Sequence, residues 1–250
     1  MTSARLNEIR AVSAILEYNE IMNRESKMRI IPLGGLEGIG KNITLFEYEE
    51  EIIIVDCGIM FPTEEMPGID YIIPDFSYIK KHRSKVKAIL VTHGHEDHIG
   101  AISYLLNEIS APIYATRLTI GLIQSRLAEL PPKKEPEFIE IQPRDRKQIG
   151  NFMVEFIKVN HSIIGGVGLA IKTDLGTVIH TGDFKIDFSP VDGDVTDIYR
   201  FADYGEKGVL LLMSDSTNAE RKGFTKSESV LVDKLKEIFT RANGRIIVAT

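Results

Sequence analysis

Three histidines and two acidic residues fall within six consecutive positions, His93 to His98. Because side chains alternate along extended backbone, His93 and His95 can face one point. Asp97 and His98 lie on the expected turn into a helix and can reach a second point nearby. Imidazole nitrogens and carboxylate oxygens bind zinc well, and also manganese or iron. The spacing therefore predicts a transition-metal site, and it leaves room for two ions.

Two ions need more ligands than one loop provides, so further candidates must come from elsewhere in the chain. His161 follows an expected strand over residues 152–159 and precedes Gly165, where backbone can approach a site closely. Asp183 follows another expected strand in the sequence HTGD, after a glycine. Taken singly, a histidine of this kind is more often structural and an aspartate of this kind more often a turn residue.

Three other residues stand at or near expected strand ends without obvious ligand spacing. We interpret His180 and Asp215 as residues that support the site or the fold rather than as substrate contacts. Cys57 is the single cysteine, which excludes an intrachain disulfide and is compatible with a reducing compartment. We expect it to be a small buried side chain.

The elements that must position these residues are many short strands interspersed with helices. Strands are expected over residues 28–33, 42–47, 52–55, 88–92, 113–115, 138–141, 152–159, 168–173, 177–181, 209–214 and 245–249, and helices over 99–109, 117–130 and 227–242. Hairpin turns such as Asp174-Leu175-Gly176 indicate mixed sheets rather than a doubly wound parallel sheet. The pattern predicts an α/β (α+β) fold of the αββα sandwich type.

The two ends of the chain and one internal segment follow different patterns. Residues 1–27 are predicted to form an amphipathic helical extension, and the sheet begins at Met28. Residues 183–207 carry several aspartates and little periodicity, so we expect a long surface loop. The strand expected over 245–249 has no turn after it, which suggests a piece of a longer protein.

The sequence lacks two complete motifs that would indicate other chemistry. Gly35 to Asn42 reads GLEGIGKN, one residue from a phosphate-binding loop. Asn42 lacks the hydroxyl that would hold magnesium, and a strand follows where that loop requires a helix. No G-x-S-x-G sequence surrounds any serine, which argues against a serine hydrolase of that kind.

Composition places the chain among soluble globular proteins. Its longest apolar runs are strand-length, far short of the roughly 20 residues of a membrane span. The N-terminus has no uninterrupted apolar stretch of the secretory type, so we expect a cytoplasmic protein without a membrane segment. The net charge of −6 argues mildly against an open nucleic-acid-binding surface.

Seven stretches in order make the chain resemble the ribonucleases J, a group of β-CASP nucleases within the metallo-β-lactamase superfamily. They are LGGLEGIGKN (33–42), FP (61–62), GIDYIIPD (68–75), HGHEDHIG (93–100), NHSI (160–163), HTGDFK (180–185) and SDSTNAE (214–220). The resemblance covers nearly everything from Met28 onward. It implies a metallo-β-lactamase domain over residues 28–240, incomplete at its C-terminal side, and the start of a β-CASP domain over 241–250.

The resemblance also implies roles for individual residues. One metal ion, zinc or alternatively manganese, would be held by His93, His95 and His161. A second would be held by Asp97 and His98, with Asp183 bridging the two. By the same resemblance Asp56 braces the ligand loop by hydrogen bonds, and a structural calcium ion is expected near Gly68 and Asp70.

The implied activity is metal-dependent hydrolysis of RNA by 5′ to 3′ exonuclease and endonuclease action. The two ions would lower the pKa of a shared water, which Asp97 would orient as the catalytic residue. The implied partner is single-stranded RNA with a 5′-monophosphate, and the full-length protein would be a homo-oligomer. Two alternatives stay open: a hydrolase of small esters, thioesters or lactones with the same ligands, and an incomplete fragment with a binding role.

Overall fold

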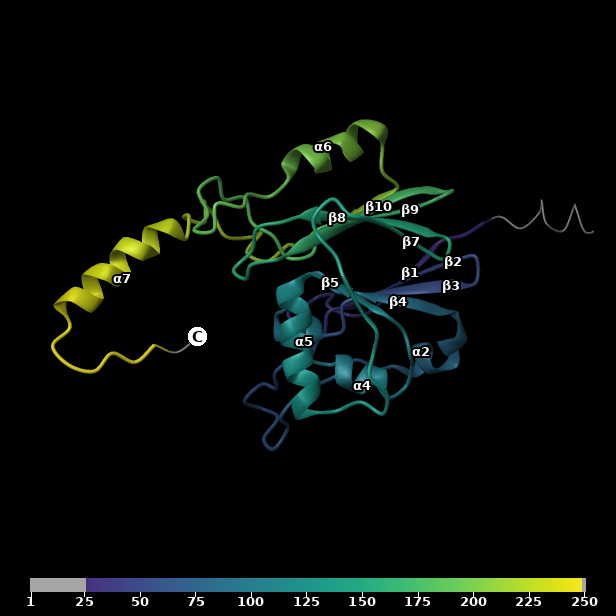
Figure 1. Ribbon diagram of the computed structural model, residues 1–250, viewed down its shortest axis with the longest axis horizontal. Helices are drawn as coiled ribbons and strands as arrows, with labels where there is room; N and C mark the ends of the chain where they lie inside the picture. The colour runs from purple at the N-terminus through teal and green to yellow at the C-terminus, as the bar shows by residue number, and fades with distance from the viewer. Residues whose placement is uncertain (1–25, 249–250) are drawn as a thin grey trace, which may run out of the picture.

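Two β-sheets lie face to face, and helices cover the outer side of each sheet (Figure 1). The computed structural model describes residues 26–248. This arrangement is the αββα sandwich that the sequence predicts. The helical extension expected over residues 1–27 falls almost entirely outside the described residues.

The first sheet is mixed and has six strands in the order β1-β2-β3-β4-β5-β6. Its strands are β1 (Arg29–Gly34), β2 (Ile43–Tyr48), β3 (Glu51–Val55), β4 (Val86–Leu90), β5 (Ile113–Ala115) and β6 (Phe138–Glu140). The first three strands pair antiparallel, and β3 to β6 run parallel. The C-terminal ends of β3 and β4 therefore meet at one edge of the sheet.

The second sheet has five strands in the order β11-β10-β9-β8-β7. Its strands are β7 (Arg146–Ile149), β8 (Phe152–Lys158), β9 (Val167–Thr173), β10 (Gly176–His180) and β11 (Leu211–Met213). Neighbours pair antiparallel except β10 and β11, which are parallel. Strands β8, β10 and β11 consequently point the same way, and their C-terminal ends share an edge. The sequence did not predict β7.

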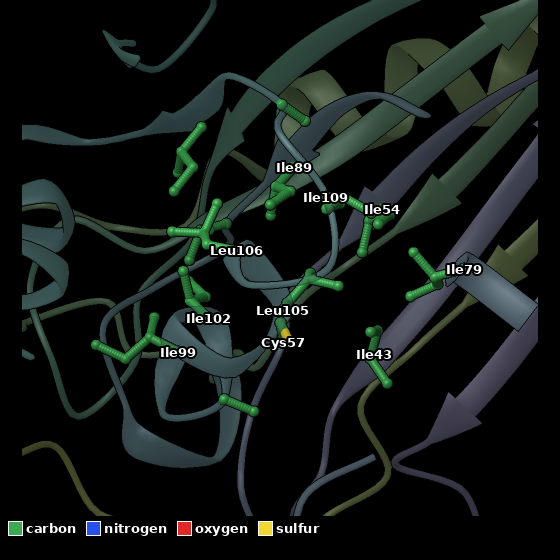
Figure 2. Packing of buried hydrophobic residues seen from close by; sticks show 14 of the residues in the cluster. Ile43, Ile54, Cys57, Ile79, Ile89, Ile99, Ile102, Leu105, Leu106 and Ile109 are labelled. Atoms are coloured by element: carbon green, nitrogen blue, oxygen red, sulfur yellow. The ribbon is translucent and has the colours of Figure 1, made fainter. Parts of the chain in front are cut away.

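Alternating side chains of the buried strands divide the interior into layers. In β3, Ile53 and Val55 face the second sheet, whereas Ile52 and Ile54 face the helices. Figure 2 shows this helix-side cluster, in which Ile54 of β3 and Ile89 of β4 pack with apolar residues of the helical layer. Cys57 belongs to the same cluster and is fully buried, as predicted.

Short helices connect the strands of the first sheet. They are α2 (Ser77–Lys81), the 3-10 turn η1 (Arg83–Lys85), α3 (Glu96–Ile99), α4 (Ile102–Leu106) and α5 (Arg117–Glu129). The helix predicted over 99–109 begins earlier than expected and is split into α3 and α4. The early start places Asp97 and His98 on the first turn of α3, after the short loop that follows β4.

The prediction of a loop over residues 183–207 is wrong in its second half. Residues 198–207 form helix α6 (Ile198–Lys207), which covers the outer face of the second sheet (Figure 1). Asp197 caps its N-terminus by accepting a hydrogen bond from the Arg200 backbone N–H at 3.2 Å. Phe201 and Tyr204, three residues apart on one face, pack on Ile157 and its buried neighbours. These two aromatic side chains form the apolar part of the contact between α6 and the sheet.

The C-terminal part carries a helix without buried residues. Helix α7 (Ser229–Arg241) projects from the sandwich (Figure 1), where the sequence predicts a helix over 227–242. The strand expected over 245–249 is not formed in its described part, residues 245–248. A strand needs a neighbour for its backbone hydrogen bonds, and no described strand lies beside this segment.

Among the described residues, no helix combines the length and the apolar character that crossing a bilayer requires.

A buried carboxylate fastens α6 to the second sheet. Glu155 on β8 is 2% exposed and accepts hydrogen bonds from Arg200 (Nη2–Oε2 2.7 Å), Tyr204 (Oη–Oε2 2.8 Å) and Arg146 (Nε–Oε2 2.7 Å). Burial by itself raises the pKa of Glu155, but these donors outweigh it and lower the pKa to about 2. The ionised carboxylate therefore stabilises the fold.

We predict that Glu155→Gln lowers the free energy of unfolding by about 3 kcal/mol at neutral pH, because it removes one charge from a buried pair. Since the folded pKa lies below the ordinary value of 4.5, this stabilisation is present above that value and is lost as the pH falls towards 2. Urea unfolding of both proteins in chelator should show their difference shrinking below about pH 4.5. A difference that does not depend on pH would contradict this account.

Candidate metal centre

The residues with ligand chemistry gather where strands of both sheets end. Asp56 follows β3, and the segment from Thr92 to His98 follows β4 at the same edge. His161 follows β8, Asp183 follows β10 and Asp215 follows β11 on the facing sheet. Sheet polarity thus brings together side chains that lie more than 100 positions apart in the sequence.

Three histidines form the first group of candidate ligands. His95 Nδ1 lies 3.1 Å from His93 Nε2 and 3.2 Å from His161 Nε2. The ligand atoms of all three lie within 4.8 Å of one another. Nitrogens converging in this way suit a borderline-soft divalent cation.

His98 and Asp183 join His93 in a second group. His98 Nε2 lies 3.4 Å from Asp183 Oδ1 and 3.5 Å from Asp97 Oδ2. Asp183 also reaches the first group, because its Oδ2 is 3.7 Å from His161 Nε2. Asp183 therefore lies within reach of both groups, whereas Asp97 lies beside His98 but, among the described residues, belongs to neither group of three.

Asp56 anchors the segment from Thr92 to His98 by hydrogen bonds. Its backbone has a positive φ of 60°, and its Oδ1 accepts the Thr92 backbone N–H at 2.7 Å. Its Oδ2 accepts the Thr92 hydroxyl at 2.9 Å and His98 Nδ1 at 2.8 Å. The Thr92 hydroxyl donates its proton to Asp56. His93 Nδ1 must therefore donate to the Thr92 hydroxyl oxygen, 3.0 Å away.

These hydrogen bonds fix which ring nitrogen carries a proton. Both His93 and His98 donate from Nδ1, so the Nε2 atom of each ring faces the two groups. A metal-binding histidine needs a free lone pair on one nitrogen and a hydrogen-bond partner on the other. The residues present therefore fit a transition-metal cation.

The electrostatics differ between the two groups. Burial lowers the pKa of His93 to about 2 and also lowers the pKa of His161, so both stay neutral as ligands must. Burial also acts to lower the pKa of His98, but the negative charges of Asp56 and Asp183 outweigh it and raise the pKa to about 10. Without a cation His98 is therefore protonated, and a cation that binds at Nε2 must displace that proton.

A cavity of about 570 Å³ opens beside the second group. Its lining includes Asp97, His98, His180, Asp183 and Asp215. His180 Nδ1 accepts the Gly182 backbone N–H at 3.1 Å, and burial lowers the pKa of His180. Among the described residues neither His180 nor Asp215 belongs to a group of three candidate ligands. The supporting role inferred from the sequence for these two residues stays a prediction.

The expected calcium residues lie apart from this centre. Gly68 has a positive φ of 81° and Asp70 is exposed. In the part of the chain that the structure describes, no group of three ligand side chains includes Asp70. Any cation there would have to rely on backbone oxygens.

Two residues of the site were not identified from the sequence. Asn42, set aside with the phosphate-loop motif, places its side-chain amide 3.1 Å from Asp97 Oδ2. Gly58 lies so close to the ligand loop that an added Cβ would be 1.5 Å from the Asp97 carbonyl oxygen. The signal available for Gly58 was its place directly after Asp56 and Cys57, at the end of a buried strand.

Comparisons with known proteins agree with this geometry. A family model described as the metallo-beta-lactamase superfamily matches residues 36–221. The chain is 47% identical over 225 residues to a ribonuclease J of Synechocystis sp.. It is 45% identical over 245 residues to that of Helicobacter pylori and 45% over 233 residues to that of Thermus thermophilus. These alignments cover 89%, 98% and 90% of this chain.

The same alignments cover 35%, 36% and 41% of the three relatives, so the chain spans well under half of their length. A solved structure, described as a protein of unknown function from Enterococcus faecalis, superposes with a TM-score of 0.63 at 20% sequence identity. That superposition covers 86% of this chain and 58% of the other. It concerns the fold alone.

We predict that Gly58→Ala lowers the thermal midpoint by about 5–10 °C and weakens cation binding, because the new methyl group must displace the backbone of α3. Differential scanning fluorimetry and cation titration would measure both effects. Gly205→Ala on α6 is the matched control, since nothing lies within 4 Å of the added Cβ. Equal behaviour of the two variants would show that the close approach at Gly58 is unimportant.

Proposed function

Because this chain belongs to the metallo-β-lactamase superfamily, we propose that it is the cation-binding part of a ribonuclease J-type enzyme that hydrolyses phosphodiester bonds of RNA. We propose both 5′ to 3′ exonuclease and endonuclease action. The proposal rests on one combined observation: relatives named ribonuclease J align along the chain at 45–47% identity, and the aligned region contains the two ligand groups. A site of this kind alone would indicate only hydrolysis.

The centre is proposed to hold two divalent cations, zinc or alternatively manganese. His93, His95 and His161 would hold one, and Asp97 and His98 the other. Asp183, which lies within reach of both groups, would bridge them. When bound, the cations would act as Lewis acids that lower the pKa of water and neutralise negative charge on phosphate oxygens.

The chain's own residues would orient the reactants. Asp97 is a quarter exposed and borders the cavity, so its carboxylate can accept a hydrogen bond from an attacking water and direct it towards phosphorus. Asp56 keeps His98 in one tautomer through its bond to Nδ1. We assign no general acid for the leaving 3′ oxygen among the described residues.

The cavity carries little positive charge of its own. Among the described residues, its lining contains the carboxylates of Glu37, Asp56, Asp97, Asp183 and Asp215 and no lysine or arginine. Without bound cations these carboxylates repel a phosphate. Affinity for RNA would therefore depend on the cations and on parts of the protein outside this chain.

Several further properties are proposed for the longer protein. They are a preference for single-stranded RNA with a 5′-monophosphate, homo-oligomer formation, a cytoplasmic location and a calcium ion at the Gly68–Asp70 turn. We also propose that residues 28–240 form an incomplete catalytic domain and that residues 241–250 begin an inserted one.

We predict that the purified chain, loaded with zinc or manganese, cleaves a 5′-monophosphorylated single-stranded RNA, and that Asp97→Asn reduces the rate at least about 100-fold. Labelled RNA resolved on a denaturing gel would measure this. Asp174→Asn is the control, because Asp174 lies in the β9–β10 turn at the opposite end of the strands and should leave the rate unchanged.

The same samples should be offered a panel of esters, thioesters and lactones. Turnover of a small ester without RNA cleavage would contradict the substrate class and favour a small-molecule hydrolase. Failure to cleave any substrate with two cations bound would contradict activity of this chain and leave a binding role.

A further inference from the structure

The side chain of Asn42 touches the second ligand group, although the sequence motif around it suggested different chemistry. Its Nδ2 lies 3.0 Å from the Asp97 carbonyl oxygen, 3.1 Å from Asp97 Oδ2 and 3.0 Å from His98 Nε2. The Asn42 backbone N–H also donates to the Asp97 carbonyl, at 3.0 Å. One residue just before β2 therefore contacts the backbone and side chain of Asp97 and lies beside His98 Nε2.

The chemistry of these partners fixes the orientation of the amide. Both Asp97 atoms are oxygens that only accept hydrogen bonds, so the amide nitrogen of Asn42 must face them. The opposite orientation would place the Asn42 oxygen against two oxygens, one of them charged. By donating to Asp97, the Asn42 amide holds the Asp97 carboxylate close to His98 Nε2.

The glycine-rich segment before Asn42 is shaped to receive this side chain. Gly35 has a positive φ of 78°, and an added Cβ there would lie 2.4 Å from Asn42 Oδ1. Gly34 is constrained as well, since a Cβ added there would lie 2.1 Å from the Lys41 carbonyl oxygen. The segment GLEGIGKN thus folds back on Asn42 instead of forming the loop before a helix that phosphate binding requires.

We propose that Asn42 is a positioning residue for the second cation, which it serves by holding Asp97 and aligning it with His98. The proposal rests on the two-cation function proposed above. Among the described residues, the hydrogen-bond partners of the Asn42 side chain are Asp97 and His98, not His95 or His161, so the first cation should not depend on it. Loss of the amide should therefore weaken one cation site selectively.

The test is cation titration of the metal-free chain and its Asn42→Leu variant, which keeps the size of the side chain and removes the donor. We expect the dissociation constant of the second cation to rise about 10–100-fold, as for other residues that orient metal ligands, while that of the first stays unchanged. Calorimetric titration with zinc against a competing chelator measures both constants. Histidine ring NMR signals identify the sites, His161 for the first and His98 for the second.

A second pair of variants independently tests the role of the glycine-rich segment before Asn42. Gly35→Ala pushes a methyl group into Asn42 and should also weaken the second cation selectively. Gly193→Ala is matched to it, because Gly193 has a φ of 77° but no atom within 4 Å of an added Cβ. The control suffers the same backbone strain and should keep both cations.

Three results would overturn the proposal: unchanged affinity for both cations in Asn42→Leu, equal weakening of both, or a wild-type chain that binds a single cation. Thermal unfolding of the metal-free proteins shows whether the variants remain folded, and Gly35→Ala provides the second case if Asn42→Leu does not. A wild type that binds two cations and loses the second in Asn42→Leu, yet cleaves no RNA, would contradict the proposed function and leave the role of Asn42 standing.

Discussion

One buried carboxylate, that of Asp56, joins the two parallel strands on which the centre depends. It follows β3, and it accepts three hydrogen bonds from residues that follow β4: the Thr92 backbone N–H, the Thr92 hydroxyl and His98 Nδ1. Through Thr92 it also sets the protonated nitrogen of His93. A backbone N–H and a hydroxyl proton would otherwise be buried without partners, which costs about 1–3 kcal/mol each. The geometry of the ligand loop thus follows from satisfying buried polar groups at one strand end.

Close packing beside Asp56 makes this anchored loop a rigid candidate cation site. Gly58 lets the backbone of the β3 end touch the backbone of Asp97, and the Cys57 and Ala101 backbones bond across the same contact. Rigid ligands lower the ordering cost of binding a cation. The facing sheet supplies His161 and Asp183 at matching strand ends, so the centre requires both sheets to be packed. Cation binding should therefore stabilise the sandwich as a whole.

Much of this could be predicted from the sequence because strand ends and ligand types are local signals. The spacing of His93, His95, Asp97 and His98 indicates a site on its own, and period-two patterns locate most strands. His161 and Asp183 became convincing only through a resemblance, since single residues at strand ends carry little information. Asn42 was missed because its partners are 55 and 56 positions away and it was considered only as part of a phosphate-loop motif that was then rejected. Helix α6 was missed because it docks through two aromatic residues and the Arg200–Glu155 pair, whose partner on β8 lies 45 positions away.

The central claim is that two cation sites share this edge and that Asp183 lies between them. Anomalous X-ray diffraction from a crystal of the zinc-loaded chain, recorded on both sides of the zinc absorption edge, tests it most directly. The account predicts two anomalous peaks, one beside His95 and His161 and the other beside Asp97 and His98, with an Asp183 oxygen between them. A single peak, or peaks away from these side chains, would contradict it.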